Sequence, residues 1–247
     1  MKVAVLVFPG TNSEEETVAA CADAGMDACL INWNQPPENL TDYDGFVLPG
    51  GFAHEDRVRA GAIAARSSMV SALVQEAGRG KLVLGICNGA QILAESGLLG
   101  EVAIGRNLPA RHFQCRYVDV RVDGRAERCA FTNGLETGTR LRMALAHGEG
   151  RFRGDPSFFD RLEEDGRIVL RYDGRAPNGA MHDAAGICNS QGNVLAIMPH
   201  PERAAWAYTM AFGDPASREG DPNRTVGAHA LFRCMAANLS GKAAARS

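Results

Sequence analysis

The sequence predicts a single α/β domain with a mostly parallel central sheet and helices on both of its faces. Short apolar runs, such as VAVLVF at residues 3–8 and LVLGI at residues 82–86, are typical of buried parallel strands. Helical segments alternate with these runs, and that alternation builds a parallel sheet. A chain of 247 residues can enclose one core. We expect residues 1–240 to form the domain and residues 241–247 to be a disordered tail.

The first half of the chain repeats a strand–helix–strand unit. Ser13 and Glu16 have the spacing of a capping box, which predicts a helix that begins after Ser13 and ends near Gly25. A helix at residues 88–95 is closed by Gly97. The other elements predicted here are strands at residues 3–8, 26–33, 46–48 and 82–86 and a helix at residues 68–79.

The second half is more mixed in pattern. Two strands are predicted on either side of a turn at Gly192-Asn193. The polar, turn-rich residues 213–224 predict a surface loop. The full set of elements predicted here is strands at residues 118–122, 168–172, 186–189 and 194–198 and a helix at residues 225–239.

The composition excludes several classes of function. A formal net charge of −3 leaves no broad basic field that would attract nucleic acid. The seven cysteines form no CxxC pair and no Cys/His ligand spacing, so we expect no metal site. The N-terminal MKVAVLVFPG lacks the pattern of a signal peptide, and no apolar stretch is long enough to span a membrane. We therefore expect a reduced, cytoplasmic setting with no membrane partner.

Residues 82–93, LVLGICNGAQIL, contain the most informative pattern. A buried strand runs into Cys87 with a glycine on each side, and a helix follows at once, which is the spacing of a nucleophile elbow. The helix directs unpaired N–H groups at the sulfur and favours the reactive thiolate. The alternative is a buried structural cysteine. That alternative fits the other six cysteines, but the flanking glycines favour a nucleophile at Cys87.

A base and its orienting carboxylate are predicted in Met-Pro-His-Pro-Glu-Arg at residues 198–203. His200 follows a strand and therefore lies at the same carboxyl edge of the sheet as Cys87. Glu202 can reach the far imidazole nitrogen, fix its tautomer and stabilise the imidazolium. A solvated loop histidine is the alternative. Only His200 among the six histidines combines a strand end, flanking prolines and a nearby carboxylate.

An oxyanion hole is predicted in the turn after the strand at residues 46–48. Backbone N–H groups near Gly51, in the turn that includes Gly50 and Phe52, and at Asn88 are the natural donors, because glycine permits close approach of the backbone. An ordinary turn would explain Gly50-Gly51 alone. The functional interpretation depends on that turn sharing the sheet edge with Cys87.

Taken together, these motifs resemble the class I, or triad-type, glutamine amidotransferases. The general motifs are PGG near residue 50, GxCxGxQ at residues 85–91 and HPE at residues 200–202. Five further blocks, in order along nearly the whole chain, resemble the glutaminase subunits of phosphoribosylformylglycinamidine synthases. They are VFPGTN at 7–12, RAGAIA at 59–64, GICNGAQIL at 85–93, AHGEG at 146–150 and NVLAIMPHPER at 193–203.

The resemblance implies a flavodoxin-like fold and a defined chemistry. Cys87 would attack the side-chain amide of L-glutamine and form a γ-glutamyl thioester and ammonia, with His200 as acid and base and Glu202 orienting it. Three further residues match family positions that help to hold the glutamine: Gln91, His147 and Gly148.

The resemblance also implies two protein partners. A synthetase subunit would use the ammonia, ATP and Mg to convert formylglycinamide ribonucleotide to the formylglycinamidine, and a small subunit would bridge the two chains. This chain has neither GxxxxGK[ST] nor a GxGxxG after a strand. We therefore expect it to bind no cofactor and place the ATP chemistry in the synthetase.

One segment departs from the family pattern. Ala53-His54-Glu55-Asp56 stands where the family commonly has Ser-Tyr-Gly-Asp after the PGGF turn.

Two alternatives to the glutaminase remain. An independent cysteine hydrolase, of the peptidase or γ-glutamyl hydrolase type, could use the same architecture. A scaffold without activity would require a broken triad, whereas all three members are present.

Overall fold

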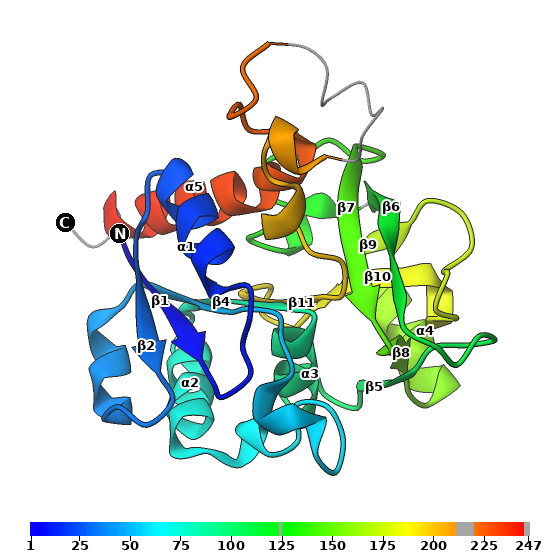
Figure 1. Ribbon diagram of the computed structural model, residues 1–247, viewed down its shortest axis with the longest axis horizontal. Coiled ribbons are helices and arrows are strands. Elements are labelled where there is room, and N and C mark those ends of the chain that lie inside the picture. The colour runs from blue at the N-terminus through cyan, green and yellow to red at the C-terminus, as the bar shows by residue number, and fades with distance from the viewer. Residues whose placement is uncertain (124, 211–219, 245–247) are drawn as a thin grey trace.

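The computed structural model describes residues 1–123, 125–210 and 220–244 of the chain (Figure 1). Its strands are β1 Lys2–Val7, β2 Asp27–Asn32, β3 Gly45–Leu48, β4 Leu82–Ile86, β5 Ala103–Arg106, β6 Gln114–Val122, β7 Arg140–His147, β8 Glu149–Arg153, β9 Ile168–Tyr172, β10 Ala184–Cys188 and β11 Val194–Ile197. Its α-helices are α1 Glu14–Asp23, α2 Ser68–Gly78, α3 Asn88–Glu95, α4 Pro156–Glu164 and α5 Ala230–Ala244.

One nine-stranded sheet organises the described chain. Its order is β2-β1-β3-β4-β11-β10-β9-β6-β7. The strands from β2 to β11 pair in parallel, whereas β10, β9, β6 and β7 pair antiparallel. A separate two-stranded ribbon joins β5 and β8. The predicted α/β domain with a mostly parallel central sheet is confirmed, and an antiparallel extension is added to it.

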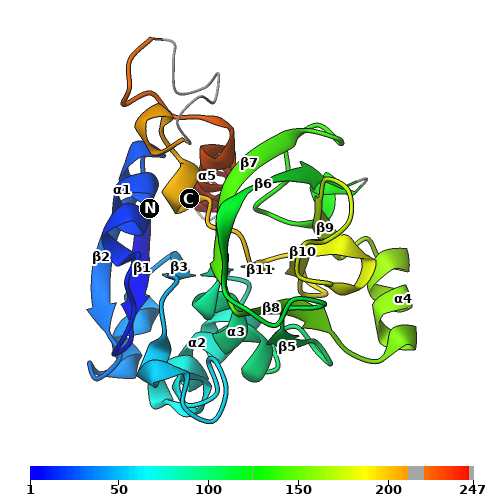
Figure 2. The ribbon, with the colours of Figure 1, turned by 45° about the vertical axis from the view of Figure 1, so that its right-hand side comes forward.

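Helices cover both faces of the parallel part of the sheet. Helices α1 and α5 lie on one face, and α2 and α3 lie on the other (Figures 1 and 2). Strands β3, β4 and β11 are buried along their whole length between these layers. Buried strands of this kind have apolar residues at successive positions, which is why their sequences predicted them.

The antiparallel half was only partly predicted. Strand β6 begins at Gln114 rather than at residue 118, and β5, β7, β8 and α4 were not predicted. Strand β7, RLRMALAH, alternates between buried and partly exposed residues. This pattern is typical of a sheet with one solvent-exposed face, and the arginines at alternate positions interrupt the run of apolar residues that would predict a strand.

The predicted capping box at the start of α1 is wrong. The Ser13 side chain makes no hydrogen bond to the first turn of α1. Its Oγ instead accepts the N–H of Gly50 at 3.0 Å, across 37 residues. The helix begins where predicted, but the Ser13 side chain holds the turn after β3 instead of capping α1.

The C-terminal prediction holds in part. A single turn of 3-10 helix at Gly227–His229 precedes α5, which continues to Ala244 and so beyond residue 240. Most of the predicted loop at residues 213–224, and residues 245–247 of the predicted tail, lie outside the described residues. No helix in the described part of the chain is long and apolar enough to cross a membrane.

The parallel topology places four turns at one edge of the sheet. Strands β1, β3, β4 and β11 follow one another in the sheet in this order and point the same way. Close to their carboxyl ends come Pro9-Gly10, Pro49-Gly50 and Cys87, and His200 lies three residues beyond the end of β11. The predicted functional residues therefore meet because of strand order, although they are up to about 150 residues apart in the chain.

We predict that Gly89→Ala strongly destabilises the fold. A Cβ at Gly89 would lie 2.0 Å from the carbonyl oxygen of Leu48, so α3 must move away from β3. The expected loss is about 1–3 kcal/mol of unfolding free energy, or more. Gly78→Ala is the control, since nothing lies within 4 Å of its added Cβ and alanine favours a helix. Urea unfolding of both variants measures this; equal stabilities would contradict the proposed close packing.

Candidate active site

Cys87 lies at a strained turn between β4 and α3. Its backbone has φ 50° and ψ −103°, in a region that residues other than glycine rarely adopt. The Cys87 N–H donates to the Ile197 carbonyl at 2.8 Å, which ties the turn to β11. A Cβ at Gly85 would meet the backbone of Gly89 at 2.8 Å. The flanking glycines are therefore needed to make this turn, as the sequence predicted.

His200 and Glu202 form a buried pair beside that turn. His200 Nδ1 lies 2.6 Å from Glu202 Oε1, and the two residues are 3% and 0% exposed. The His200 N–H donates to the Ala144 carbonyl of β7 at 2.7 Å, which fixes the backbone of the loop. His200 Nε2 is buried without a hydrogen-bond partner among the described residues. One ring nitrogen is thus oriented by the carboxylate, and the other is available for chemistry.

The charges around His200 favour its protonated form. Burial alone would lower the pKa of the ring, but the negative charges of Glu202 and of the Cys87 sulfur outweigh it and raise the pKa to about 10. The Cys87 sulfur lies 3.7 Å from the carbonyl oxygen of Ala146 near the end of β7. The three residues predicted as a triad are therefore in one electrostatic cluster.

Two backbone N–H groups near Cys87 remain free. The Gly50 N–H donates to Ser13 Oγ at 3.0 Å, and the Phe52 N–H donates to the Gly10 carbonyl at 2.8 Å. Within the described ranges, neither the Gly51 nor the Asn88 N–H donates a hydrogen bond. Of the four residues predicted around an oxyanion hole, Gly51 and Asn88 thus have donors free to receive a substrate oxygen.

The Asn88 side chain holds the turn that carries Gly51 against the start of α3. Its Oδ1 accepts the Ala53 N–H at 2.9 Å, two residues beyond Gly51. Its Nδ2 donates to Asp56 at 3.1 Å and to Gln91 Oε1 at 2.9 Å. The Gly89 N–H also donates to the Pro49 carbonyl at 3.1 Å. The turn after β3 and the start of α3 are consequently held as one unit.

Gln91 is held by the protein itself. Its Nε2 donates to the Glu149 carbonyl at 2.6 Å, and the residue is only 5% exposed. Its amide thereby connects α3 to β8. A role in binding glutamine remains a prediction for Gln91, because both ends of its amide already have protein partners.

His147 lies at the end of β7 in a buried polar network. Its Nδ1 lies 3.0 Å from Asn107 Oδ1, and its Nε2 has no partner among the described residues. Burial, and then the charge of His200, lower the pKa of His147 to about 3. The ring is therefore neutral at physiological pH. Beside it, Gly148 accepts the Asn107 N–H at 3.0 Å.

Asn107 is the organising residue that sequence reasoning missed. It is fully buried, and its Nδ2 donates to the carbonyls of His147 at 2.9 Å and His112 at 3.1 Å. Its Oδ1 also accepts the Gly150 N–H at 3.2 Å. No local signal marks an asparagine that follows a short strand and holds β7 and β8 through contacts about 40 residues away. Only the fold reveals it.

The segment that departs from the family pattern has an unusual backbone. His54, Glu55 and Asp56 have φ values of 54°, 59° and 52°, all in the left-handed region that glycine prefers. The family has glycine at one of these three positions, whereas this chain has none. Burial, and then the charge of Glu149, raise the pKa of Asp56 to about 6, against a smaller opposing effect of its hydrogen bond to Asn88.

The nucleophile is largely buried, and no metal-binding cluster is found in the described part of the chain. Cys87 is 5% exposed. Among the described residues, no group of three or more His, Cys, Asp or Glu side chains could hold a metal ion. All seven cysteines are free.

We predict that Glu202→Gln lowers the pKa of His200. The folded-state pKa of about 10 lies above the ordinary 6.5, so the protonated ring stabilises the fold below pH 6.5, and this stabilisation is lost as pH rises through about 10. Removing the carboxylate should move the His200 NMR titration midpoint to lower pH. His229, whose ring hydrogen-bonds to Ala20 and Arg233 and to neither of these residues, is the internal control. An unchanged midpoint would contradict the pairing.

Known proteins match this chain over most of its length. A family model for the CobB/CobQ-like glutamine amidotransferase domain matches residues 1–233. Phosphoribosylformylglycinamidine synthase subunit PurQ of Methanothrix thermoacetophila is 39% identical over 92% of this chain and 95% of its own length. Its counterpart from Thermus thermophilus is 44% identical over 83% of this chain and 90% of its own.

Solved structures agree with these relatives. A chain in the structure of PurLQS from Thermotoga maritima has a TM-score of 0.80 and 33% identity, covering 96% of this chain and 98% of its own length. A glutamine amidotransferase from the same organism has a TM-score of 0.56 at 17% identity and shares the fold. By the extent of the family match and by these identities, the chain belongs to the glutamine amidotransferases, in the PurQ family of phosphoribosylformylglycinamidine synthase subunits.

Proposed function

We propose that this chain is the glutaminase subunit of a phosphoribosylformylglycinamidine synthase. It would hydrolyse L-glutamine to glutamate and ammonia and pass the ammonia to a synthetase subunit. The observation that carries the proposal is the strained turn at Cys87 beside the buried His200–Glu202 pair, with the free N–H groups of Gly51 and Asn88 at the same sheet edge.

The first half of the reaction forms a thioester. The Cys87 sulfur attacks the side-chain amide carbon of glutamine, and the negative charge that develops on the amide oxygen is stabilised by the N–H groups of Gly51 and Asn88. The protonated His200 donates its Nε2 proton to the amide nitrogen. The carbon–nitrogen bond then breaks, ammonia leaves, and the γ-glutamyl group remains on the sulfur.

The second half returns the enzyme to its starting state. His200 Nε2, now neutral, takes a proton from water, and the hydroxide attacks the thioester carbonyl in the same oxyanion hole. The carbon–sulfur bond breaks, and glutamate is released. Glu202 holds Nδ1 protonated throughout and stabilises each imidazolium that forms.

Several neighbouring residues would position the substrate. Gln91, Gly148 and neutral His147 border the cluster from α3 and the β7–β8 turn. His147 Nδ1 donates to Asn107 Oδ1, so in the neutral ring the unpartnered, buried Nε2 accepts one hydrogen bond from bound glutamine. Gly50 and Phe52 would act through the turn that carries Gly51, because their own N–H groups are already bonded.

The proposed function requires partners that carry the remaining chemistry. The similar chain from Thermotoga maritima belongs to the assembly PurLQS. By that analogy we place the ATP- and Mg-dependent step in a synthetase subunit and expect a small bridging subunit. A cytoplasmic location is consistent with the seven free thiols.

An independent cysteine hydrolase remains the alternative for the same site chemistry. Peptidases and γ-glutamyl hydrolases also need a nucleophile, a base and an oxyanion hole. The family membership of the chain favours the coupled glutaminase. An assay of the assembled complex separates the two functions.

We predict that Cys87→Ser abolishes glutamine-dependent synthesis and leaves synthesis from added ammonium largely intact. The substitution removes only the source of ammonia, because the synthetase reaction takes place in another subunit. The measurement is formation of the formylglycinamidine product by the reconstituted complex with either nitrogen donor. Equal loss of both activities in a complex that still assembles would contradict the proposed division of labour.

A further inference from the structure

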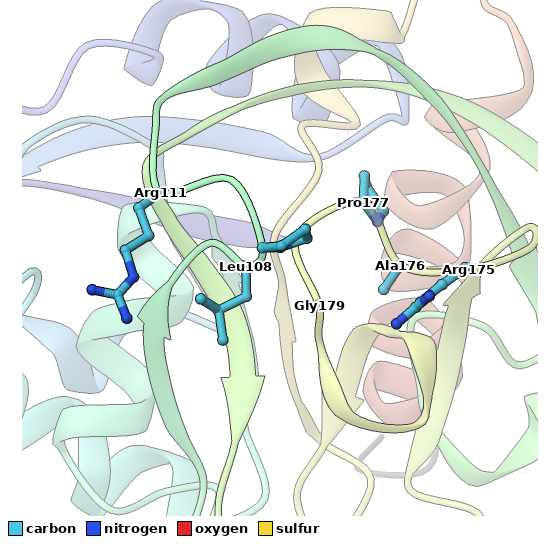
Figure 3. Close-up of a pocket in the computed structure, with 7 residues that line it drawn as sticks. Leu108, Arg111, Arg175, Ala176, Pro177 and Gly179 are labelled. Atoms are coloured by element: carbon cyan, nitrogen blue, oxygen red, sulfur yellow. The ribbon is translucent and has the colours of Figure 1, made fainter.

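A hollow of about 730 Å³ lies at the loop that follows β5. Its floor is apolar and is made by Leu108, Pro109, Ala176 and Pro177, while Arg111 and Arg175 line its sides. Figure 3 shows these two arginines extending on either side of Leu108. Both arginines are exposed. The hollow thus combines an apolar surface with two cationic groups that are open to a partner.

Two more arginines extend this positive surface. A carbon added at Gly179 would lie 3.5 Å from Cδ of Arg151, and one added at Gly105 would lie 3.0 Å from Cδ of Arg153. Burial, and then the positive charges of Arg153 and Arg111, lower the pKa of Arg151. These guanidinium groups are therefore close enough to repel one another.

The neighbouring acidic groups do not neutralise this surface. Among the residues that the structure describes, none of Arg111, Arg151, Arg153 and Arg175 pairs with a carboxylate. Glu149 pairs with Arg106 at 3.4 Å, and Asp183 accepts the Ala176 N–H at 2.6 Å.

Four unpaired arginines on a chain of net charge −3 leave a local excess of positive charge that an acidic partner would neutralise. We call these four arginines and the apolar floor the arginine hollow.

The arginine hollow is joined to the site by short hydrogen-bonded links. The Leu108 N–H donates to the Asn178 carbonyl at 3.0 Å, and Asn178 Nδ2 donates to the Gly150 carbonyl at 2.7 Å. Asn107, one residue before Leu108, holds His147. A partner seated in the hollow would therefore rest on the same framework that positions His147 near Cys87.

We propose that the arginine hollow docks an extended acidic segment of the synthetase subunit, with an apolar side chain on the floor and carboxylates on the arginines. This inference rests on the proposed function. Arg111 and Arg175 line the apolar floor, Arg151 lies close to Gly179 of that lining, and Arg153 is two residues farther along β8. This spread of charge suits an extended segment better than one small anion. The synthetase is the occupant because it receives the ammonia released at Cys87, and the hollow is hydrogen-bonded to the framework that holds His147 in the same site.

The test is charge reversal in the assembled complex. Arg111→Glu combined with Arg175→Glu should weaken the affinity of this chain for the complex of the cognate synthetase and small subunit by about 10-fold or more. The salt dependence of binding should fall as well. Arg125→Glu is the matched control, since Arg125 is exposed and follows the opposite end of β6. Its affinity should stay within about twofold of the parent chain.

Photo-crosslinking identifies the occupant. A benzophenone amino acid at Ala110, between Pro109 and Arg111, should crosslink to an Asp- or Glu-rich segment of the synthetase. Crosslinking to the small subunit instead, or an unchanged affinity in the double variant, would overturn the proposal.

Labelling of Cys87 by a glutamine-analogue electrophile separates the two hypotheses. If the parent chain is labelled there but charge reversal has no effect, only the docking proposal fails. If Cys87 of the parent chain is not labelled, the proposed function fails.

Discussion

The backbone turn at Cys87 is the constraint on which the other parts of the site depend. A left-handed φ of 50° at a residue with a side chain costs about 1–3 kcal/mol, and it persists only where the surroundings enforce it. Here β11 holds the Cys87 N–H, and the bare backbones of Gly85 and Gly89 let β4, α3 and β3 approach one another. The same packing that strains the cysteine also raises its side chain to the sheet edge at the amino end of a helix.

The packing around that turn also sets the geometry of the remaining groups. Hydrogen bonds from Gly50 to Ser13, from Ala53 to Asn88 and from His200 to Ala144 tie each edge turn to a different element. No single loop therefore carries the site alone. Preorganised donors of this kind are effective because they need not reorient as charge develops.

The sequence predicted the parallel half of the fold and the core of the candidate site for one physical reason. Buried strands and the residues that end them are specified locally, so LVLGICNG and MPHPE could be interpreted without knowing their neighbours. Asn107 and the pairing of Ser13 with Gly50 could not, because the parts of the site that these side chains hold lie 37 or more residues away. Strand β7 was not predicted, because arginines at alternate, outward-facing positions interrupt its apolar residues. The capping-box prediction failed at Ser13 for the same reason: a distant N–H competed for its hydroxyl.

The central claim is that Cys87 is the nucleophile and carries the γ-glutamyl group during turnover. The most direct measurement is mass spectrometry of the acid-quenched complex during steady-state turnover of glutamine, followed by peptide mapping of all seven cysteines. The account predicts a glutamyl adduct on the Cys87 peptide alone, present with glutamine and absent when ammonium is the nitrogen donor. An adduct on another cysteine, or active turnover without any adduct on Cys87, would contradict it.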